Sequence, residues 1–156
     1  MKQELDKLLC EKYPKMMVNR NKNMQETCMC WGFECGDGWF NILNQLMGNI
    51  QHHIDWKEKQ RKWAIEFNSK AAPEDMRPVP DSIPQVTLDQ VKEKFGTLRF
   101  YYTGGDDYIS GLVTMAESMS GVTCEACGNP GESIGGGWIR TLCEAHSGRK
   151  ADNAEN

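Results

Sequence analysis

The sequence feature that most restricts the fold is a group of four metal-ligand residues near the C-terminal end. Cys124 and Cys127 are separated by two residues, as are Cys143 and His146, and fifteen residues lie between the two pairs. A short turn can direct two donors at one ion, and three thiolates with one imidazole suit tetrahedral zinc. The spacing therefore predicts a zinc site with Cys124, Cys127, Cys143 and His146 as ligands.

The residues between the two pairs indicate how this site is built. Gly128, Pro130 and Gly131 favour a turn, residues 135–137 are all glycine, and residues 138–142 are typical of a returning strand. We expect a treble-clef or ribbon-like zinc finger, with the second ligand pair on the first turn of a terminal helix. Four protein ligands leave no coordination position for a reacting water, so the zinc is expected to be structural.

The cysteine count also bears on the compartment. The chain has seven cysteines in 156 residues, and an odd number excludes complete internal disulfide pairing. Its first thirteen residues lack the apolar segment of a signal peptide, and no run is apolar enough to span a membrane. We therefore expect a cytoplasmic protein without membrane association, in which clustered cysteines serve as metal ligands or catalytic groups more often than as disulfide partners.

The other cysteines allow two interpretations. Cys28, Cys30 and Cys35 could form a second metal site with His52 or His53. Alternatively, they are small buried side chains on a short strand at residues 27–35, where free cysteine behaves as a hydrophobe. The buried interpretation is the favoured one.

The hydrophobic pattern predicts the remaining elements. Apolar residues recur at helical spacing in residues 2–12 and 40–67, and again after Asp106 in Ile109, Leu112, Val113, Ala116 and Met119. Asp37 is placed to cap the long helix. Residues 85–103 alternate as in a β-hairpin that turns at Phe95 and Gly96, although a helix beginning at Thr87 is the alternative.

These elements predict an α+β protein with helices packed on a small antiparallel sheet. Four of the six prolines lie in residues 72–84, which we interpret as an irregular connector. We expect a body at residues 1–120, a zinc-binding module at 121–146 and a flexible tail at 147–156.

The hairpin suggests a binding surface. Its register would place Lys92 opposite Arg99, with Lys94 and Tyr101 on the same face. Like charges across a ladder are unfavourable unless an anion lies between them. Alternatively, a nearby carboxylate neutralises the patch, from Glu93, Asp106 or Asp107.

A second candidate surface is the Gly-Asp-Gly turn at residues 36–38. Four aromatic residues flank it: Trp31, Phe33, Trp39 and Phe40. Most should enter the core, but a tryptophan beside an exposed turn can anchor a partner. Trp39 and Asp37 are therefore candidate binding residues.

Three stretches together resemble a family of small, mostly uncharacterised proteins encoded by tailed bacteriophages, prophages and bacteria. They are residues 31–40 (WGFECGDGWF), residues 91–102 (VKEKFGTLRFYY), and the metal-ligand segment with CEACG at 124–128 and GWIRTLCEAH at 137–146. The resemblance implies a setting in a bacterial cytoplasm and carries no established activity.

Three functions are compatible with these observations. The favoured one is a non-enzymatic zinc-stabilised interaction protein that binds a host protein, as a phage accessory or counter-defence factor. The alternative is a nucleic-acid or nucleotide binder using the hairpin face, which the net charge of -4 opposes. An enzyme built around Asp37 and His52 or His53 is the third, although no HExxH, GxSxG or P-loop pattern is present.

Overall fold

The computed structural model describes residues 1–148. Its helices and strands are α1 (Gln3–Lys12), β1 (Phe33–Glu34), α2 (Phe40–Asn68), β2 (Thr87–Lys94), β3 (Thr97–Thr103), α3 (Asp107–Ser120), β4 (Glu132–Ile134), β5 (Arg140–Leu142) and α4 (Glu144–Ser147). Short 3-10 helices occupy Cys28–Trp31, Asp37–Trp39 and Pro73–Asp75. No helix in residues 1–148 has the length and apolar character needed to cross a membrane. Most of the predicted tail, residues 149–156, lies outside the described residues.

The predicted α+β class is confirmed, because helices pack beside a small sheet. The prediction that this sheet is antiparallel is wrong, because the sheet is mixed. β2 pairs antiparallel with β3, whereas β1 pairs parallel with β2, with Phe33 beside Val91. Parallel neighbours need a long crossover. Here α2 and the segment after it supply that crossover, a connection that a pattern of short strands does not reveal.

The hairpin between β2 and β3 follows the predicted register. Lys92 is paired with Arg99, and the chain turns at Phe95 and Gly96, whose φ angles are 53° and 79°. Two successive positive φ angles are typical of a type I′ turn, which matches the twist of the flanking strands. The alternative helix beginning at Thr87 is therefore wrong.

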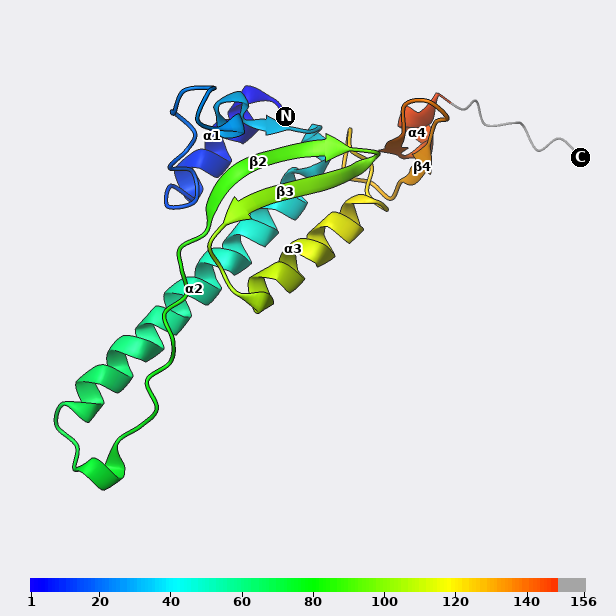
Figure 1. The fold of residues 1–156 in the computed structure, drawn as a ribbon. Helices are drawn as coiled ribbons and strands as arrows, with labels where there is room; N and C mark the ends of the chain where they lie inside the picture. Colours follow the sequence, from blue (N-terminus) through cyan, green and yellow to red (C-terminus); the bar gives the residue numbers. More distant parts are fainter. Residues whose placement is uncertain (149–156) are drawn as a thin grey trace, which may run out of the picture.

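Helices α2 and α3 lie together on one side of the sheet (Figure 1). The core between the sheet and the two helices consists of large buried side chains from both layers. Among them are Trp39, Leu43, Met47, Ile50, Leu88, Val91, Leu98 and Ile109. The segment that follows α1 contacts the start of β2, where the backbone N–H of Leu88 donates to the carbonyl oxygen of Met16 at 2.9 Å.

Three local predictions are corrected. The predicted strand at 27–35 is a strand only at Phe33–Glu34. Residues 28–31 form a 3-10 helix instead, and the Thr27 side chain caps it by accepting a hydrogen bond from the Met29 N–H. Asp37 does not cap α2, because its carboxylate accepts a hydrogen bond of 2.7 Å from the Lys2 N–H. Met119 was expected on the inner face of α3, yet its side chain is 47% exposed.

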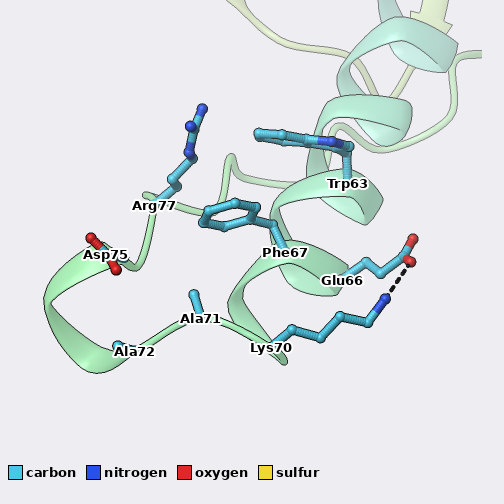
Figure 2. A pocket seen from close by; sticks show the side chains of 8 residues that line it. All are labelled: Trp63, Glu66, Phe67, Lys70, Ala71, Ala72, Asp75 and Arg77. Carbon is cyan, nitrogen blue, oxygen red and sulfur yellow. Dashed lines mark hydrogen bonds and ion pairs between the residues drawn. The ribbon is translucent and has the colours of Figure 1, made fainter.

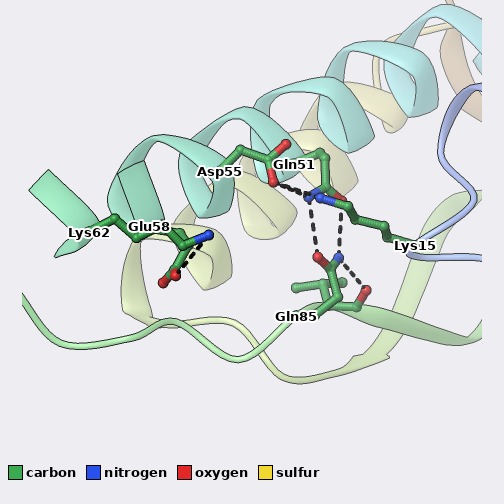
Figure 3. A network of polar contacts seen from close by, with 7 residues as sticks. Lys15, Gln51, Asp55, Glu58, Lys62 and Gln85 are labelled. Atoms are coloured by element: carbon green, nitrogen blue, oxygen red, sulfur yellow. Dashed lines mark hydrogen bonds and ion pairs between the residues drawn. The ribbon is translucent and has the colours of Figure 1, made fainter. Parts of the chain in front are cut away.

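Helix α2 continues well past the sheet, as Figure 1 shows. A polar network marks the point where it leaves the body (Figure 3). The amides of Gln51 and Gln85 donate to each other at 3.2 and 3.0 Å, and Asp55 accepts hydrogen bonds from both Gln51 and Lys15. The proline-rich connector is confirmed as irregular apart from the short turn at Pro73–Asp75.

Candidate metal centre

The four predicted ligands lie together in the structure. Their donor atoms are all within 4.8 Å of one another. The Sγ atoms of Cys127 and Cys143 are 3.7 Å apart, and His146 Nδ1 is 3.7 Å from Cys124 Sγ and 3.1 Å from Cys143 Sγ. Cys124 is buried, whereas Cys127 and His146 are exposed. The cluster therefore lies at the protein surface, with one of its thiols in the interior.

Backbone hydrogen bonds shape the turn that carries the first ligand pair. The N–H of Gly128 donates to the carbonyl oxygen of Cys124 at 2.8 Å, and the N–H of Cys124 donates to that of Asn129 at 2.7 Å. Gly128 has a φ of 82°, which glycine adopts without strain. This tight turn directs both thiols to one side of the backbone.

The second ligand pair follows the β4–β5 hairpin. Cys143 is the residue that precedes α4, and the N–H of His146 donates to the Cys143 carbonyl oxygen at 3.0 Å. The first turn of α4 thus places both side chains beside the Cys124 turn. The expected order of turn, hairpin and short helix is present.

The two thiols of the first pair differ in acidity. Burial disfavours the ionised form of Cys124, but the backbone N–H groups of Cys143, Cys127 and Ala126 outweigh it and lower the pKa of this thiol to about 6. For Cys127 the Asn129 N–H favours ionisation, yet desolvation and the neighbouring Cys124 and Cys143 raise its pKa. Metals bind thiolates rather than thiols. A cation bound between these sulfur atoms would therefore favour the ionised form of both cysteines.

The Gly-Asp-Gly turn packs directly against the ligand turn. The Gly38 N–H donates to the Glu125 carbonyl oxygen at 2.8 Å. A Cβ atom on Gly38 would lie 2.1 Å from the Cys124 carbonyl oxygen and 2.5 Å from the Gly128 nitrogen. Only glycine allows so close an approach of two backbones.

Glu125 and Trp39 complete this contact. The Glu125 side chain is buried, accepts a hydrogen bond of 2.9 Å from the Gly36 N–H, and lies 3.6 Å from the guanidinium of Arg140. The indole N–H of Trp39 donates to the Thr123 carbonyl oxygen at 2.8 Å. Trp39 is fully buried, which corrects its expected place in an exposed binding surface.

The β2–β3 turn makes a second contact with the metal-binding segment. The Thr141 hydroxyl donates to the Gly96 carbonyl oxygen at 2.6 Å, and a Cβ on Gly96 would lie 3.0 Å from a methyl carbon of Ile139. The Gly-Asp-Gly turn, the hairpin turn and the ligand segment thus meet in space. Sequence reasoning missed Glu125 and Thr141, whose polar character in a segment poor in core residues was the only available signal.

The remaining cysteines do not form a second metal cluster within residues 1–148. Cys28 is exposed, and the Cys30 thiol donates to the Thr27 carbonyl oxygen. Burial raises the pKa of the Cys35 thiol to about 12, so it is a neutral core side chain. The interpretation as small buried residues therefore applies to Cys35, and the second metal site is wrong for the described residues.

The candidate enzyme residues do not converge. Asp37 forms an ion pair with Lys2 at 3.3 Å, whereas His53 Nε2 lies 2.9 Å from Asp106 Oδ2 and its ring packs on Tyr108. His53 is thirteen residues beyond Phe40, about 20 Å along α2. The predicted pairing of Asp37 with a histidine is therefore wrong.

The hairpin residues share one face, as the register requires. Lys92 Nζ lies 5.7 Å from the centre of the Tyr101 ring, and Lys94 Nζ lies 5.5 Å from that of Phe95. Arg99 donates to the Thr97 hydroxyl and the Leu98 carbonyl oxygen. Within residues 1–148, none of these three cations has a carboxylate within 4.0 Å.

Two of the three carboxylates expected to neutralise this face have other partners. Glu93 accepts a hydrogen bond from the Gly96 N–H, and Asp106 caps α3 and bonds His53. Glu34, which is paired with Lys92 in the sheet, accepts a hydrogen bond from the Gln90 amide instead.

No protein-family model, curated protein or solved structure matches this chain.

Proposed function

We propose that the Cys124–Cys127–Cys143–His146 cluster holds a structural zinc ion. With Zn–S bonds of about 2.3 Å, a tetrahedral site separates its sulfur atoms by about 3.8 Å and a sulfur from a nitrogen by about 3.6 Å. The sulfur atoms of Cys127 and Cys143 are 3.7 Å apart, and Cys124 Sγ is 3.7 Å from His146 Nδ1. The order of ligand turn, hairpin and helix supports a treble-clef or ribbon-like finger.

We further propose that the protein is a non-enzymatic binding protein, and that the zinc ion fixes its hairpin surface. The β2–β3 turn contacts the zinc module through Thr141 and Gly96. Metal binding therefore stabilises the tip of the hairpin that carries Lys92 and Arg99. The role of the ion in this proposal is structural, because four protein ligands close its coordination shell.

The observation that supports a binding role is the unneutralised cation pair on β2 and β3. Lys92 faces Arg99 across the ladder, and neither has a carboxylate within 4.0 Å in the described chain. Like charges directly opposite each other destabilise a sheet. A partner that supplies carboxylates between them would turn this repulsion into charge-assisted hydrogen bonds.

The partner in this proposal is a host protein with an acidic surface. The resemblance to bacteriophage and prophage proteins supports a bacterial partner and a role as an accessory or counter-defence factor. The net charge of -4 disfavours binding that depends on total charge, but it does not weaken a local contact between two protein surfaces.

One observation favours a nucleic acid as the second candidate. The Tyr101 side chain is 43% exposed and lies beside Lys92 on the same face. Exposed aromatic rings among cations can stack on bases of single-stranded nucleic acid. Such binding would weaken steeply as the salt concentration rises.

The test is affinity purification of the intact chain from bacterial cells, with a Lys92→Ala and Arg99→Ala double variant beside the wild type. The proposal expects one host protein that copurifies with the wild type and is lost in the variant. A Lys22→Ala variant is the control, because Lys22 is exposed and lies outside the hairpin. Recovery of nucleic acid would support the second candidate, and equal recovery by all variants would contradict both.

A further inference from the structure

Residues 56–84 form an arm that projects from the body. It consists of the last part of α2 and the connector that returns along it, and Figure 1 shows it extending beyond both the sheet and α3. Ala64 is the only buried residue of the arm. The arm therefore contributes almost nothing to the hydrophobic core.

Polar contacts nevertheless hold the arm in a defined shape. The Asn68 amide accepts a hydrogen bond of 2.9 Å from the Arg77 N–H and donates one of 2.8 Å to the Arg77 carbonyl oxygen. Nearer the body, Arg61 donates to the Pro80 carbonyl oxygen at 3.0 Å. Two separate clamps thus fix the connector against the helix and fix the position of Arg77.

The helix of the arm carries a stripe of aromatic side chains. Trp56, Trp63 and Phe67 are spaced by seven and four residues, which places them on one helical face. Trp56 and Trp63 are 50% and 52% exposed. Burying such large side chains in a partner would be strongly favourable.

Arg77 extends this stripe onto the connector. Its guanidinium lies 5.0 Å from the Trp63 ring centre and 4.8 Å from that of Phe67, and these two rings stack on each other (Figure 2). The three residues border an open hollow of about 550 Å³. Within the described residues Arg77 makes no ion pair, so its guanidinium edge is available to an anion.

The charge of the arm is divided between its two halves. The helical half carries four cations and two carboxylates, Lys57, Lys59, Arg61 and Lys62 against Glu58 and Glu66. Both carboxylates already pair with a lysine four residues later, Lys62 within α2 and Lys70 just after it. The helix of the arm is therefore net positive, whereas the connector carries Glu74, Asp75 and Asp81 against Lys70 and Arg77.

We infer that the arm docks into an apolar groove of a partner protein, and that carboxylates border this groove. Exposed tryptophan beside arginine is the composition of binding hot spots, and a helical stripe at this spacing fits recognition of a helix in a groove. The net positive charge of the helix selects an acidic rim through charge complementarity. This surface shares no residue with the Lys92 and Arg99 face, so the inference goes beyond the proposed function.

The first step of the test identifies the partner by photo-crosslinking of the full chain in bacterial cells. A photoreactive benzoylphenylalanine replaces Trp56 in one variant and Trp138 in the control. Trp138 is 73% exposed but lies between β4 and β5, outside the arm. The inference expects a protein crosslinked at position 56 only, through a peptide that lines an apolar groove with acidic residues at its rim.

The second step measures the affinity of the purified partner for variants of the chain. A Trp63→Ala and Arg77→Ala double variant should raise Kd at least tenfold, and Arg77→Ala alone should flatten the dependence of Kd on salt. The Trp138→Ala and Lys22→Ala variants should leave this Kd unchanged, because both residues lie outside the arm and the hairpin face. The Lys92→Ala variant is measured beside them to separate the two surfaces. Far-UV circular dichroism confirms that the arm variants keep their helix content.

Several results would overturn the inference. They are crosslinks at position 56 no stronger than at position 138, crosslinks only to nucleic acid or to a second copy of the chain, and an unchanged Kd in the double variant. Loss of binding in the Lys92 variant with full binding in the arm variants would support the proposed function and reject the arm. The opposite pattern would support the arm alone.

Discussion

The indole N–H of Trp39 donates a hydrogen bond of 2.8 Å to the carbonyl oxygen of Thr123, the residue just before the first metal ligand. This contact joins the start of α2 to the metal-binding segment. Trp39 and Cys124 are both fully buried, so the core and the ligand turn are parts of one packed unit. Changes at the metal centre should therefore alter the stability of the start of α2.

A Cys127→Ser substitution should abolish stoichiometric zinc binding. The hydroxyl is a far poorer zinc ligand than a thiolate, and three remaining ligands would leave the shell open. Residues 121–146 should then exchange their amide hydrogens faster. Elemental analysis of the purified chain and hydrogen exchange measure these effects.

Cys28→Ser is the matched control, because Cys28 is an exposed cysteine outside the cluster. This variant should keep the wild-type zinc content and exchange rates. Normal zinc content in the Cys127→Ser chain would contradict the assignment of the ligands.

A Gly38→Ala substitution should destabilise the protein without touching a ligand. The new Cβ would meet the Cys124 carbonyl oxygen at 2.1 Å, so one of the two backbones must move. We expect a loss of about 1–3 kcal/mol, the usual cost of overpacking. Chemical denaturation of the metal-loaded protein measures the free energy of unfolding.

The control for this prediction is Gly111→Ala. Gly111 lies inside α3, and no atom is within 4 Å of the Cβ it would gain. Because alanine favours helix over glycine, this variant should be stabilised by about 0.5–1 kcal/mol. Similar effects of the two substitutions would refute the close approach at Gly38.

Much of the fold could be predicted because the signals were local. The ligand spacing, the helical periodicity and the turn at Phe95 and Gly96 each depend on neighbouring residues. Such features need no knowledge of distant partners.

The errors concerned contacts between distant segments. Asp37 looked like a helix cap, but Lys2, thirty-five residues away, offers its carboxylate a better hydrogen bond. Trp39 looked like a surface residue beside a turn, and the ligand segment covers it. The parallel pairing of β1 with β2 likewise depends on a crossover that no local pattern specifies.

The acid sensitivity of the protein should depend on Asp106. Burial disfavours the ionised form, but hydrogen bonds from His53 and the Ile109 N–H outweigh it and lower the pKa of this carboxyl below its ordinary value of 3.8. A carboxyl with a lowered pKa in the folded state adds stability above its unfolded pKa. That stability is lost as the pH falls through the folded value.

An Asp106→Asn variant tests this relation, because asparagine still caps a helix but carries no charge. Its free energy of unfolding should be lower than that of the wild type at pH 6. The difference should shrink as the pH falls below about 4. Since both chains keep the same metal ligands, effects of acid on the metal centre cancel in the comparison. A difference that does not vary with pH would contradict the role of the charge.

The hairpin cations should cost stability as well as provide a binding surface. Lys92 lies opposite Arg99, and neither has a carboxylate within 4.0 Å in residues 1–148. Arg99 is the charge to reverse, because it lies on the edge strand β3, whereas Lys92 also has Glu34 beside it on β1. An Arg99→Glu substitution should therefore stabilise the isolated protein by about 0.2–1 kcal/mol at low salt. The gain should fade at about 1 M salt, where charges on the surface are screened.

The reference for this last prediction is Lys22→Glu, which makes the same change of net charge at an exposed site away from the hairpin. Its effect should stay small at both salt concentrations. If Arg99→Glu stabilises the chain and also abolishes partner binding, the cation pair is retained for function at the expense of stability, as is common at binding sites. Destabilisation by Arg99→Glu at low salt would instead mean that the pair is not repulsive, and the argument for an anionic partner at this face would fail.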